Sequence, residues 1–222
     1  MSRSKKKVSD RYDVWTPFYD AVDNFPLISR SQKIWKKNAV DLLDPSDGER
    51  VLDIGTGTGQ VLIWIADRMK KGVVIGSDIS ESMVKKARKK MDRNEKTPDD
   101  LTLKVIKDDI ESSKFPDNYF DKMIATFTFT TIPDMEKAAS ECARMLKPDG
   151  KMIILDTGRP KKRYGYLLFY PMMLSAKVFG RTHMDRDVKG VVSKKFEIYE
   201  VEENMVGMVY TLECRRRKTK NK

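Results

Sequence analysis

The sequence predicts a single doubly wound α/β domain. Short apolar runs rich in Val and Ile alternate with helical patterns along most of the chain, as in a parallel sheet built from crossover units. A glycine-rich stretch follows the first of these runs and leads into a helical pattern. The length of 222 residues suits one domain, which can bury a sufficient core without disulfides or a structural metal.

The elements follow in order along the chain. We expect strands at residues 50–54, 72–77, 101–107, 120–127 and 151–156, and helices at 59–69, 80–92 and 135–145. In the first helix Val61, Ile65 and Met69 recur at the spacing of one buried face. Residues 148–150, Pro-Asp-Gly, predict a turn into the fifth strand. Residues 196–202 and 205–214 are separated by only two residues, which is too few for a parallel crossover, so they predict an antiparallel hairpin at the sheet edge.

The net charge of +11 is concentrated at the two ends of the chain. Residues 1–7 and 215–222 carry ten basic and no acidic side chains, which leaves 34 basic and 33 acidic residues between them. Short like-charged ends are typical of solvated tails that attract polyanions, so we expect non-specific attraction to RNA or an anionic membrane. A dedicated binding arm is the alternative.

Composition also limits the chemistry. Cys142 and Cys214 lie far apart without a C-x-x-C motif, and His183 is the only histidine, so we expect no metal site. The sequence has no apolar run of about 18 residues and no apolar core of a secretory signal. We therefore expect a reduced, cytoplasmic protein that can contact a membrane peripherally.

The glycine-rich stretch, residues 51–59 with the sequence VLDIGTGTG, predicts a cofactor loop. Glycines let a ligand approach the backbone, and the following helix N-terminus supplies free N–H donors. A dinucleotide motif requires a third glycine where this chain has Gln60. Asp53 would oppose a pyrophosphate but suits an ammonium or sulfonium, which favours a cationic nucleoside. The alternative is a tight turn whose glycines serve packing alone.

Further carboxylates are predicted at the same edge of the sheet. Asp78 ends the second strand, 23 residues beyond Gly55, where a Rossmann-type site places an acceptor for the ribose hydroxyls. Ser80 is expected to cap the next helix. Asp108 and Asp109 end the third strand, where one carboxylate could accept from an adenine amino group and the other could be solvated. Asp78 alone could be an ordinary helix cap.

Four motifs together resemble a known family. Residues 12–20 are similar to Y-D-x-x-A-x-x-Y-D with Thr16 in the alanine position, residues 78–83 to D-x-S-x-x-M, and residues 144–150 to R-x-L-K-P-G-G, while VLDIGTGTG matches a cofactor loop. From residue 12 to about 159 the chain resembles class I S-adenosylmethionine-dependent methyltransferases, in the branch with ubiquinone/menaquinone C-methyltransferases and bacterial phosphatidylethanolamine N-methyltransferases. The resemblance implies S-adenosylmethionine as cofactor and a Rossmann-like sheet of about seven strands.

The resemblance also implies roles for individual residues. Asp78 would hold the ribose, Ile79 and Met83 would lie against the adenine, Asp109 and Ile110 would bracket the adenine edge, and Thr126 and Phe127 would reach the methionine portion. Tyr12 and Tyr19 lie in a segment that covers cofactor and substrate in the family. The implied cofactor-binding residues are Asp53, Gly55, Thr56, Gly57, Thr58, Gly59, Asp78, Ile79, Met83, Asp109, Ile110, Thr126 and Phe127.

The match becomes weaker after residue 156. Residues 157–160 are similar to a loop of quinone methyltransferases, but the Y-x-Y-L-x-x-S segment of those enzymes has no counterpart, which disfavours ring C-methylation of a quinone. Residues 164–180 carry one charge and follow a basic stretch. They predict either a helix buried on the sheet or an apolar lid that faces the membrane. In both cases we expect an apolar pocket wall with Phe169 and Met172, and a lipophilic or lipid-like acceptor.

Methyl transfer from a sulfonium is an in-line displacement whose leaving group needs no proton, so no catalytic base is obligatory. Tyr19 could orient the acceptor and His183 could deprotonate it. The alternatives are an RNA methyltransferase and a non-catalytic S-adenosylmethionine-binding partner subunit. The expected organisation is a tail at 1–10, cap helices at 11–45, a cofactor-binding core at 46–156, the apolar segment at 157–195, the hairpin at 196–214 and a tail at 215–222.

Overall fold

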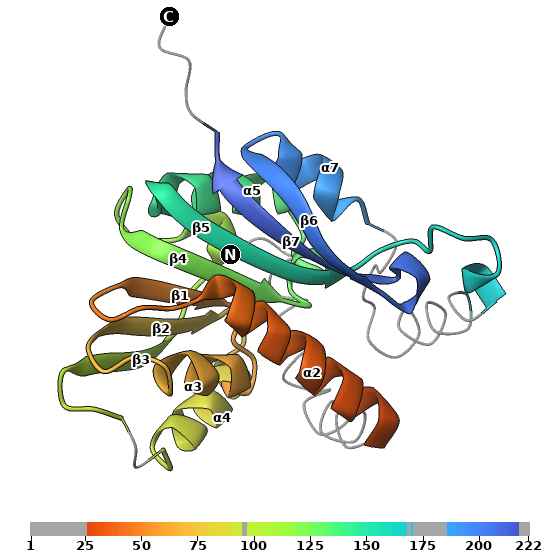
Figure 1. The fold of residues 1–222 in the computed structure, drawn as a ribbon. Helices are drawn as coiled ribbons and strands as arrows, with labels where there is room; N and C mark the ends of the chain where they lie inside the picture. Colours follow the sequence, from red (N-terminus) through yellow and green to blue (C-terminus); the bar gives the residue numbers. More distant parts are fainter. Residues whose placement is uncertain (1–25, 95–96, 168–169, 171–185, 218–222) are drawn as a thin grey trace, which may run out of the picture.

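The computed structural model describes residues 26–94, 97–167, 170 and 186–217. In the described residues seven strands form one sheet in the order β3-β2-β1-β4-β5-β7-β6 (Figure 1). The strands are β1 (Arg50–Ile54), β2 (Gly72–Asp78), β3 (Leu101–Lys107), β4 (Phe120–Thr126), β5 (Leu146–Thr157), β6 (Phe196–Asn204) and β7 (Val209–Arg216). The helices are α2 (Pro26–Leu43), α3 (Gln60–Ala66), α4 (Glu81–Met91), α5 (Met135–Met145) and α7 (Val188–Ser193), with short 3₁₀ turns η1 (Ile110–Ser112), η2 (Phe129–Thr131) and η4 (Met205–Gly207).

Strands β1 to β5 pair in parallel, whereas β7 pairs antiparallel with both β5 and β6. The doubly wound sheet of seven strands and the antiparallel hairpin at its edge are therefore confirmed. Along the chain the sheet grows from β1 to β3 in one direction and from β4 onward in the other. The carboxyl ends of β1 and β4 thus form the switch point where open α/β sheets bind ligands.

Two apolar clusters cover the two faces of the sheet. Helices α5 and α7 pack on one face with Leu52 and Ile54, while α2, α3 and α4 pack on the other with Val51 (Figure 1). Because successive strand residues point to opposite faces, Asp53 points toward the α2, α3 and α4 side. Burial on both faces explains the continuous apolar runs at residues 123–125 of β4 and 152–155 of β5.

Strand β5 begins earlier than predicted. It starts at Leu146, which pairs with Phe120, and the pairing then slips so that Lys122 lies opposite Lys151. The predicted turn at residues 148–150 is therefore wrong, because these residues form a bulge inside the strand. Leu146 is completely buried, so the chain returns to the sheet before the proline.

Strand β7 runs past its predicted end. The basic tail was expected from residue 215, but Arg215 and Arg216 belong to β7. Arg216 donates to the Asn118 side chain at 2.5 Å and to the Leu146 carbonyl at 3.2 Å, and Arg215 donates to Glu213 at 2.7 Å. Since Leu146 and Glu213 lie on strands and Asn118 lies in the turn before β4, the first two arginines belong to the folded domain.

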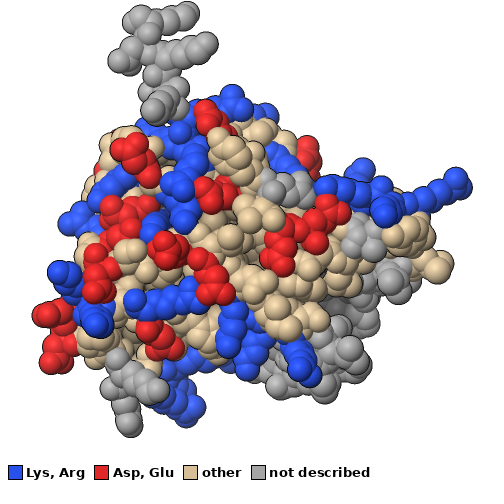
Figure 2. Space-filling view, in the orientation of Figure 1, with Lys and Arg blue, Asp and Glu red and all other residues tan. Residues whose placement is uncertain are grey.

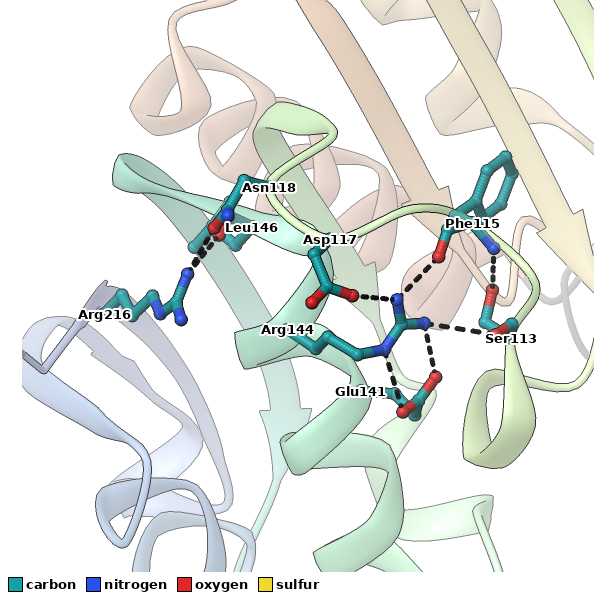
Figure 3. A network of polar contacts seen from close by, with 8 residues as sticks. All are labelled: Ser113, Phe115, Asp117, Asn118, Glu141, Arg144, Leu146 and Arg216. Carbon is teal, nitrogen blue, oxygen red and sulfur yellow. Dashed lines mark hydrogen bonds and ion pairs between the residues drawn. The ribbon is translucent and has the colours of Figure 1, made fainter. Parts of the chain in front are cut away.

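Arg144, from the R-x-L-K-P-G-G-like motif, joins α5 to the connection between η1 and β4 (Figure 3). Its guanidinium donates to the carbonyls of Phe115 at 2.7 Å and Ser113 at 3.1 Å, and it pairs with Asp117 and Glu141 at 2.7 Å each. Several donors in a fixed planar fork suit this task. The motif therefore fixes the connection that begins beside the predicted adenine residues.

Candidate functional site at the carboxyl edge of the sheet

The topology brings the predicted carboxylates to one edge. Asp53 lies near the end of β1, Asp78 ends β2, Asp109 lies two residues after the end of β3, and Thr126 ends β4. These four strands are neighbours and parallel, so their carboxyl ends share an edge. The cofactor-binding residues that the sequence predicts are thus collected around the switch point.

The three alternating glycines have different tasks. Gly55, Gly57 and Gly59 have φ values of 64°, 54° and 80°, a region that residues with a Cβ rarely adopt. A Cβ on Gly55 would lie 2.5 Å from the Thr128 methyl carbon, and one on Gly59 would lie 3.0 Å from the Ala87 Cβ. On Gly57 the nearest described atom would be 4.0 Å away. Two glycines therefore permit close packing, whereas Gly57 leaves its backbone open to approach, which a loop built for packing alone does not require.

Asp53 is a buried carboxylate with one satisfied oxygen. Its side chain is 1% exposed, and its Oδ2 accepts a hydrogen bond from the Thr56 hydroxyl at 2.6 Å. Within the part of the chain that the structure describes, its Oδ1 is buried without a hydrogen-bond partner. Burial raises the pKa of Asp53 to about 7, because desolvation disfavours the charged form. A cation next to Oδ1 would stabilise the carboxylate.

Asp78 holds the glycine loop against β2. Its Oδ2 accepts from the Gly57 backbone N–H and its Oδ1 from the Ser80 N–H, each at 2.9 Å. Each carboxylate oxygen has two lone pairs and can accept more than one hydrogen bond. Ser80 caps α4, as predicted, because its hydroxyl accepts from the Met83 N–H at 3.3 Å.

The two aspartates after β3 differ. Asp109 accepts from the Glu111 N–H at 3.1 Å and from the Ser112 hydroxyl at 3.3 Å, and so begins η1. The Oδ2 of Asp108 is buried with no partner among the described residues, and burial raises the pKa of Asp108. Ile110 packs partly buried against the α5 face.

The end of β4 is tied to the end of β1 by a residue that the sequence reasoning missed. The Thr128 hydroxyl lies 3.2 Å from the Ile54 carbonyl and 3.1 Å from the Thr126 carbonyl. Phe127, between Thr126 and Thr128, has a φ of 54° and donates its N–H to the Leu155 carbonyl at 2.7 Å. A non-glycine residue in this region of φ is often found at functional sites. The only sequence signal for Thr128 was its position directly after a predicted strand.

A second buried carboxylate stands behind the loop between β4 and α5, residues 127–134. Asp156 is completely buried and accepts from the Thr130 N–H at 3.2 Å, the Thr130 hydroxyl at 2.8 Å and the Thr157 N–H at 2.7 Å. Burial raises the pKa of Asp156 to about 6. Arg186 donates to the carbonyls of Ile132 and Pro133 in the same loop. This loop is therefore held from two sides.

Comparison with known proteins assigns the chain to a family. Residues 52–154 match the model of a methyltransferase domain. The demethylmenaquinone methyltransferase of Bacillus cereus strain ATCC 10987 is 30% identical over 189 residues, which cover 81% of this chain and 73% of that protein. The chain belongs to the class I S-adenosylmethionine-dependent methyltransferases.

Solved structures agree with the methyltransferase fold. A Thermotoga maritima protein described as an S-adenosylmethionine-dependent methyltransferase, possibly a histamine N-methyltransferase, has a TM-score of 0.69 at 19% identity and covers 95% of this chain and 100% of its own. The [4+2]-cyclase SpnF has a TM-score of 0.72 at 17% identity, with 96% of both chains covered. At these identities the similarity concerns the fold, and one fold can support different reactions.

The residues at the carboxyl edge of this methyltransferase fit its cofactor. The buried Oδ1 of Asp53 suits a sulfonium or ammonium, and the open backbone at Gly57 leaves room for a ligand. Among the described residues no group of three or more His, Cys, Asp or Glu side chains is arranged to hold a metal ion. The described part of the chain also contains no helix of sufficient length and apolarity to span a membrane.

The predicted acceptor residues lie outside the described residues. They are Tyr12, Tyr19, Phe169, Met172 and His183. The predicted basic tail at residues 1–10 and the part of the predicted cap that precedes α2 also lie outside the described residues.

The segment that follows β5 presents apolar side chains to solvent. Tyr164, Leu167 and Tyr170 are 65%, 82% and 58% exposed, and the Tyr166 and Tyr170 rings lie 5.7 Å apart. Lys161, Lys162 and Arg163 precede them. In Figure 2 basic side chains gather on the projection at the right, where Figure 1 shows this segment, while the rest of the visible face mixes both charges.

Proposed function

We propose that the protein transfers a methyl group from S-adenosylmethionine, bound at the carboxyl edge of β1 to β4, to a lipophilic small molecule. The observation that carries the cofactor site is the buried Asp53 carboxylate with an unsatisfied Oδ1 beside the glycine loop. Ionising a buried carboxylate is costly, and a cationic ligand beside it reduces that cost.

The proposed cofactor contacts follow the order of the strands. Asp53 would face the cationic centre, and residues 55–59 would lie along the methionine portion together with Thr126 and Phe127. Asp78 would accept from the ribose hydroxyls while it holds Gly57. Ile79 and Met83 would cover the adenine, and Asp109 and Ile110 would lie at its edge. The sequence resemblance and the shared sheet edge support these roles.

The cofactor supplies an electrophilic methyl group on a sulfonium, so the chain has to align the acceptor and exclude water. We propose that residues 127–134 form one wall of the acceptor site, because they follow β4 at the switch point. Asp156 and Arg186 hold this wall in place. Tyr19 and His183 remain candidates for contact with the acceptor.

The lipophilic acceptor is inferred from the segment after β5. Its described part exposes Tyr164, Leu167 and Tyr170 behind a basic stretch, a combination suited to the interface of an anionic membrane. Phe169 and Met172 of the same segment would line the acceptor pocket. The named substrate of the demethylmenaquinone methyltransferase relative is also lipophilic. Because the quinone-specific segment has no counterpart in the sequence, we propose the lipophilic class and not that quinone.

The test is a labelling experiment with a matched pair of variants. Purified protein is incubated with methyl-labelled S-adenosylmethionine and separate lipid, small-molecule and RNA fractions of its source. We expect label in the lipid fraction. Leu167→Glu should raise KM for that acceptor and remove salt-resistant binding to vesicles that contain anionic lipid, with cofactor affinity unchanged. Tyr199→Glu, at another exposed apolar site, on β6, should behave as wild type. Label in RNA alone, or equal losses in both variants, would contradict the proposal.

A further inference from the structure

Helix α2 contributes a basic side chain to the proposed cofactor site. We infer that Lys36 binds the carboxylate at the amino-acid end of the cofactor, an inference that rests on the proposed S-adenosylmethionine site and adds a residue to it. The carboxylates at the strand ends cannot bind this anion, because Asp53 and Asp78 are acidic.

The packing of α2 directs Lys36 to the face of the sheet that carries Val51 and Asp53. Ala39 and Val40, three and four residues further along the helix, are completely buried in the cluster that contains Val51. Residues three and four apart share one side of a helix, so half-buried Lys36 lies one turn before Ala39 and Val40 on the side that covers the sheet. Asp53 points toward this same layer, because it lies two residues after Val51 on β1.

One ring contact and one electrostatic interaction place the Lys36 ammonium near the switch point. Its Nζ lies 5.7 Å from the centre of the Phe127 ring, directly after β4. Its positive charge also acts on Asp53 and partly opposes the rise in the pKa of that carboxyl, whose main cause is burial. Attraction to an aromatic face helps to hold an ammonium in position before a ligand binds.

The chemistry of the ligand requires both charges. S-adenosylmethionine carries two cationic groups, the sulfonium and the α-ammonium, and one anion, the α-carboxylate. Asp53 complements the cations but repels the carboxylate, whose energy in a partly buried site depends on a nearby cation. Lys36 and Asp53 together would therefore fix the direction in which the amino-acid end lies.

The neighbouring lysine provides a matched control. Lys37 also lies over an aromatic ring, with its Nζ 5.6 Å from the centre of Trp64, but its side chain is exposed. Adjacent helix residues point about 100° apart, so the two lysines face different surroundings. Lys36→Gln and Lys37→Gln thus remove the same charge and the same type of ring contact from one helix.

The experiment compares ligands with and without the carboxylate. Calorimetry measures the binding of S-adenosylhomocysteine and of 5′-methylthioadenosine. The second ligand keeps the adenine, ribose and thioether but lacks the amino-acid end. The affinity of the weaker ligand is measured by competition. Lys36→Gln should lower the affinity for S-adenosylhomocysteine about tenfold or more, since a charge-assisted hydrogen bond is lost. It should leave the affinity for 5′-methylthioadenosine within about twofold of wild type, and Lys37→Gln should change the affinity for neither ligand.

Other outcomes separate the possible errors. Equal losses for both ligands would show that Lys36 acts on the pocket as a whole, for example by keeping Asp53 ionised, and would overturn the inference. Unchanged affinity for both would also overturn it. If wild-type protein bound neither ligand, the proposed cofactor site itself would fail, which is a different result.

Discussion

Two buried carboxylates on opposite faces of the sheet show how the proposed cofactor side and the proposed acceptor side differ. Asp53 on β1 has a buried oxygen without a partner in the described chain, whereas Asp156 on β5 accepts three hydrogen bonds from Thr130 and Thr157. Burial raises the pKa of both, to about 7 and about 6. We interpret Asp53 as prepared for a ligand and Asp156 as a support for the loop at residues 127–134.

The largest expected effect sharpens this comparison on the cofactor side. Gly55→Ala places a Cβ 2.5 Å from the Thr128 methyl at a φ of 64°. Backbone strain and overpacking should together lower the free energy of unfolding by about 3 kcal/mol and weaken cofactor binding strongly. Denaturant unfolding and calorimetry measure both quantities.

Gly57→Ala is the control for this clash, because a Cβ there comes no closer than 4.0 Å to any described atom. The backbone strain of a non-glycine residue at this φ should alone lower the free energy of unfolding by about 1 kcal/mol. Adding Thr128→Ala to Gly55→Ala should restore part of the stability. If the two glycine variants lost equal stability, the packing role of Gly55 would be wrong.

On the acceptor side, Thr130→Val leaves buried Asp156 without its hydroxyl donor and should destabilise by about 1–3 kcal/mol. The folded pKa of Asp156 is raised, so the stability it contributes is greatest below pH 3.8 and is lost as the pH rises through about 6. The hydroxyl stabilises the charged form, so Thr130→Val should cost more at pH 8 than at pH 5.

Unfolding curves at the two pH values check this difference. In an Asp156→Asn background, which cannot ionise, the cost of Thr130→Val should no longer depend on pH. A cost that stayed pH-dependent there would assign the effect to another group.

Asp53 predicts a pH dependence of binding. Its carboxyl is neutral below a pKa of about 7, and a cationic ligand requires the anion. Affinity for S-adenosylmethionine should therefore rise about tenfold from pH 6 to pH 8, with proton release on binding. Calorimetry in two buffers of different ionisation enthalpy measures both. Asp53→Asn should bind weakly with a flat profile, and an equally steep profile in that variant would exclude Asp53 as the cause.

The smallest expected effect concerns the surface after β5. Leu167 is 82% exposed, so Leu167→Glu should change the free energy of unfolding by less than about 0.5 kcal/mol. A thermal melt decides whether residues 164–180 form a helix buried on the sheet or an apolar lid that faces the membrane. A large loss of stability would show that Leu167 is part of the core, and the lipophilic acceptor would lose its main support.

The sequence predicted what depends on local pattern. The bounds of β1, β3 and α5 agree with the structure because apolar runs and helical spacing are local patterns. Asp53 and Asp78 were placed at one edge because parallel strands share their carboxyl ends. It could not predict contacts between distant segments. Thr128 against Gly55, Asp156 with Thr130, and Lys36 near Phe127 each depend on which loops and helices the fold brings together.

The central claim, that the carboxyl edge of β1 and β2 binds S-adenosylmethionine, is tested most directly at Asp78. Asp78→Asn keeps an oxygen that can accept from the Gly57 N–H but loses the negative charge and one acceptor. Calorimetry with the folded variant should show S-adenosylmethionine affinity lowered about 10- to 100-fold, as expected for the loss of a charge-assisted hydrogen bond to the ribose. Unchanged affinity in a variant that melts at the wild-type temperature would contradict the claim.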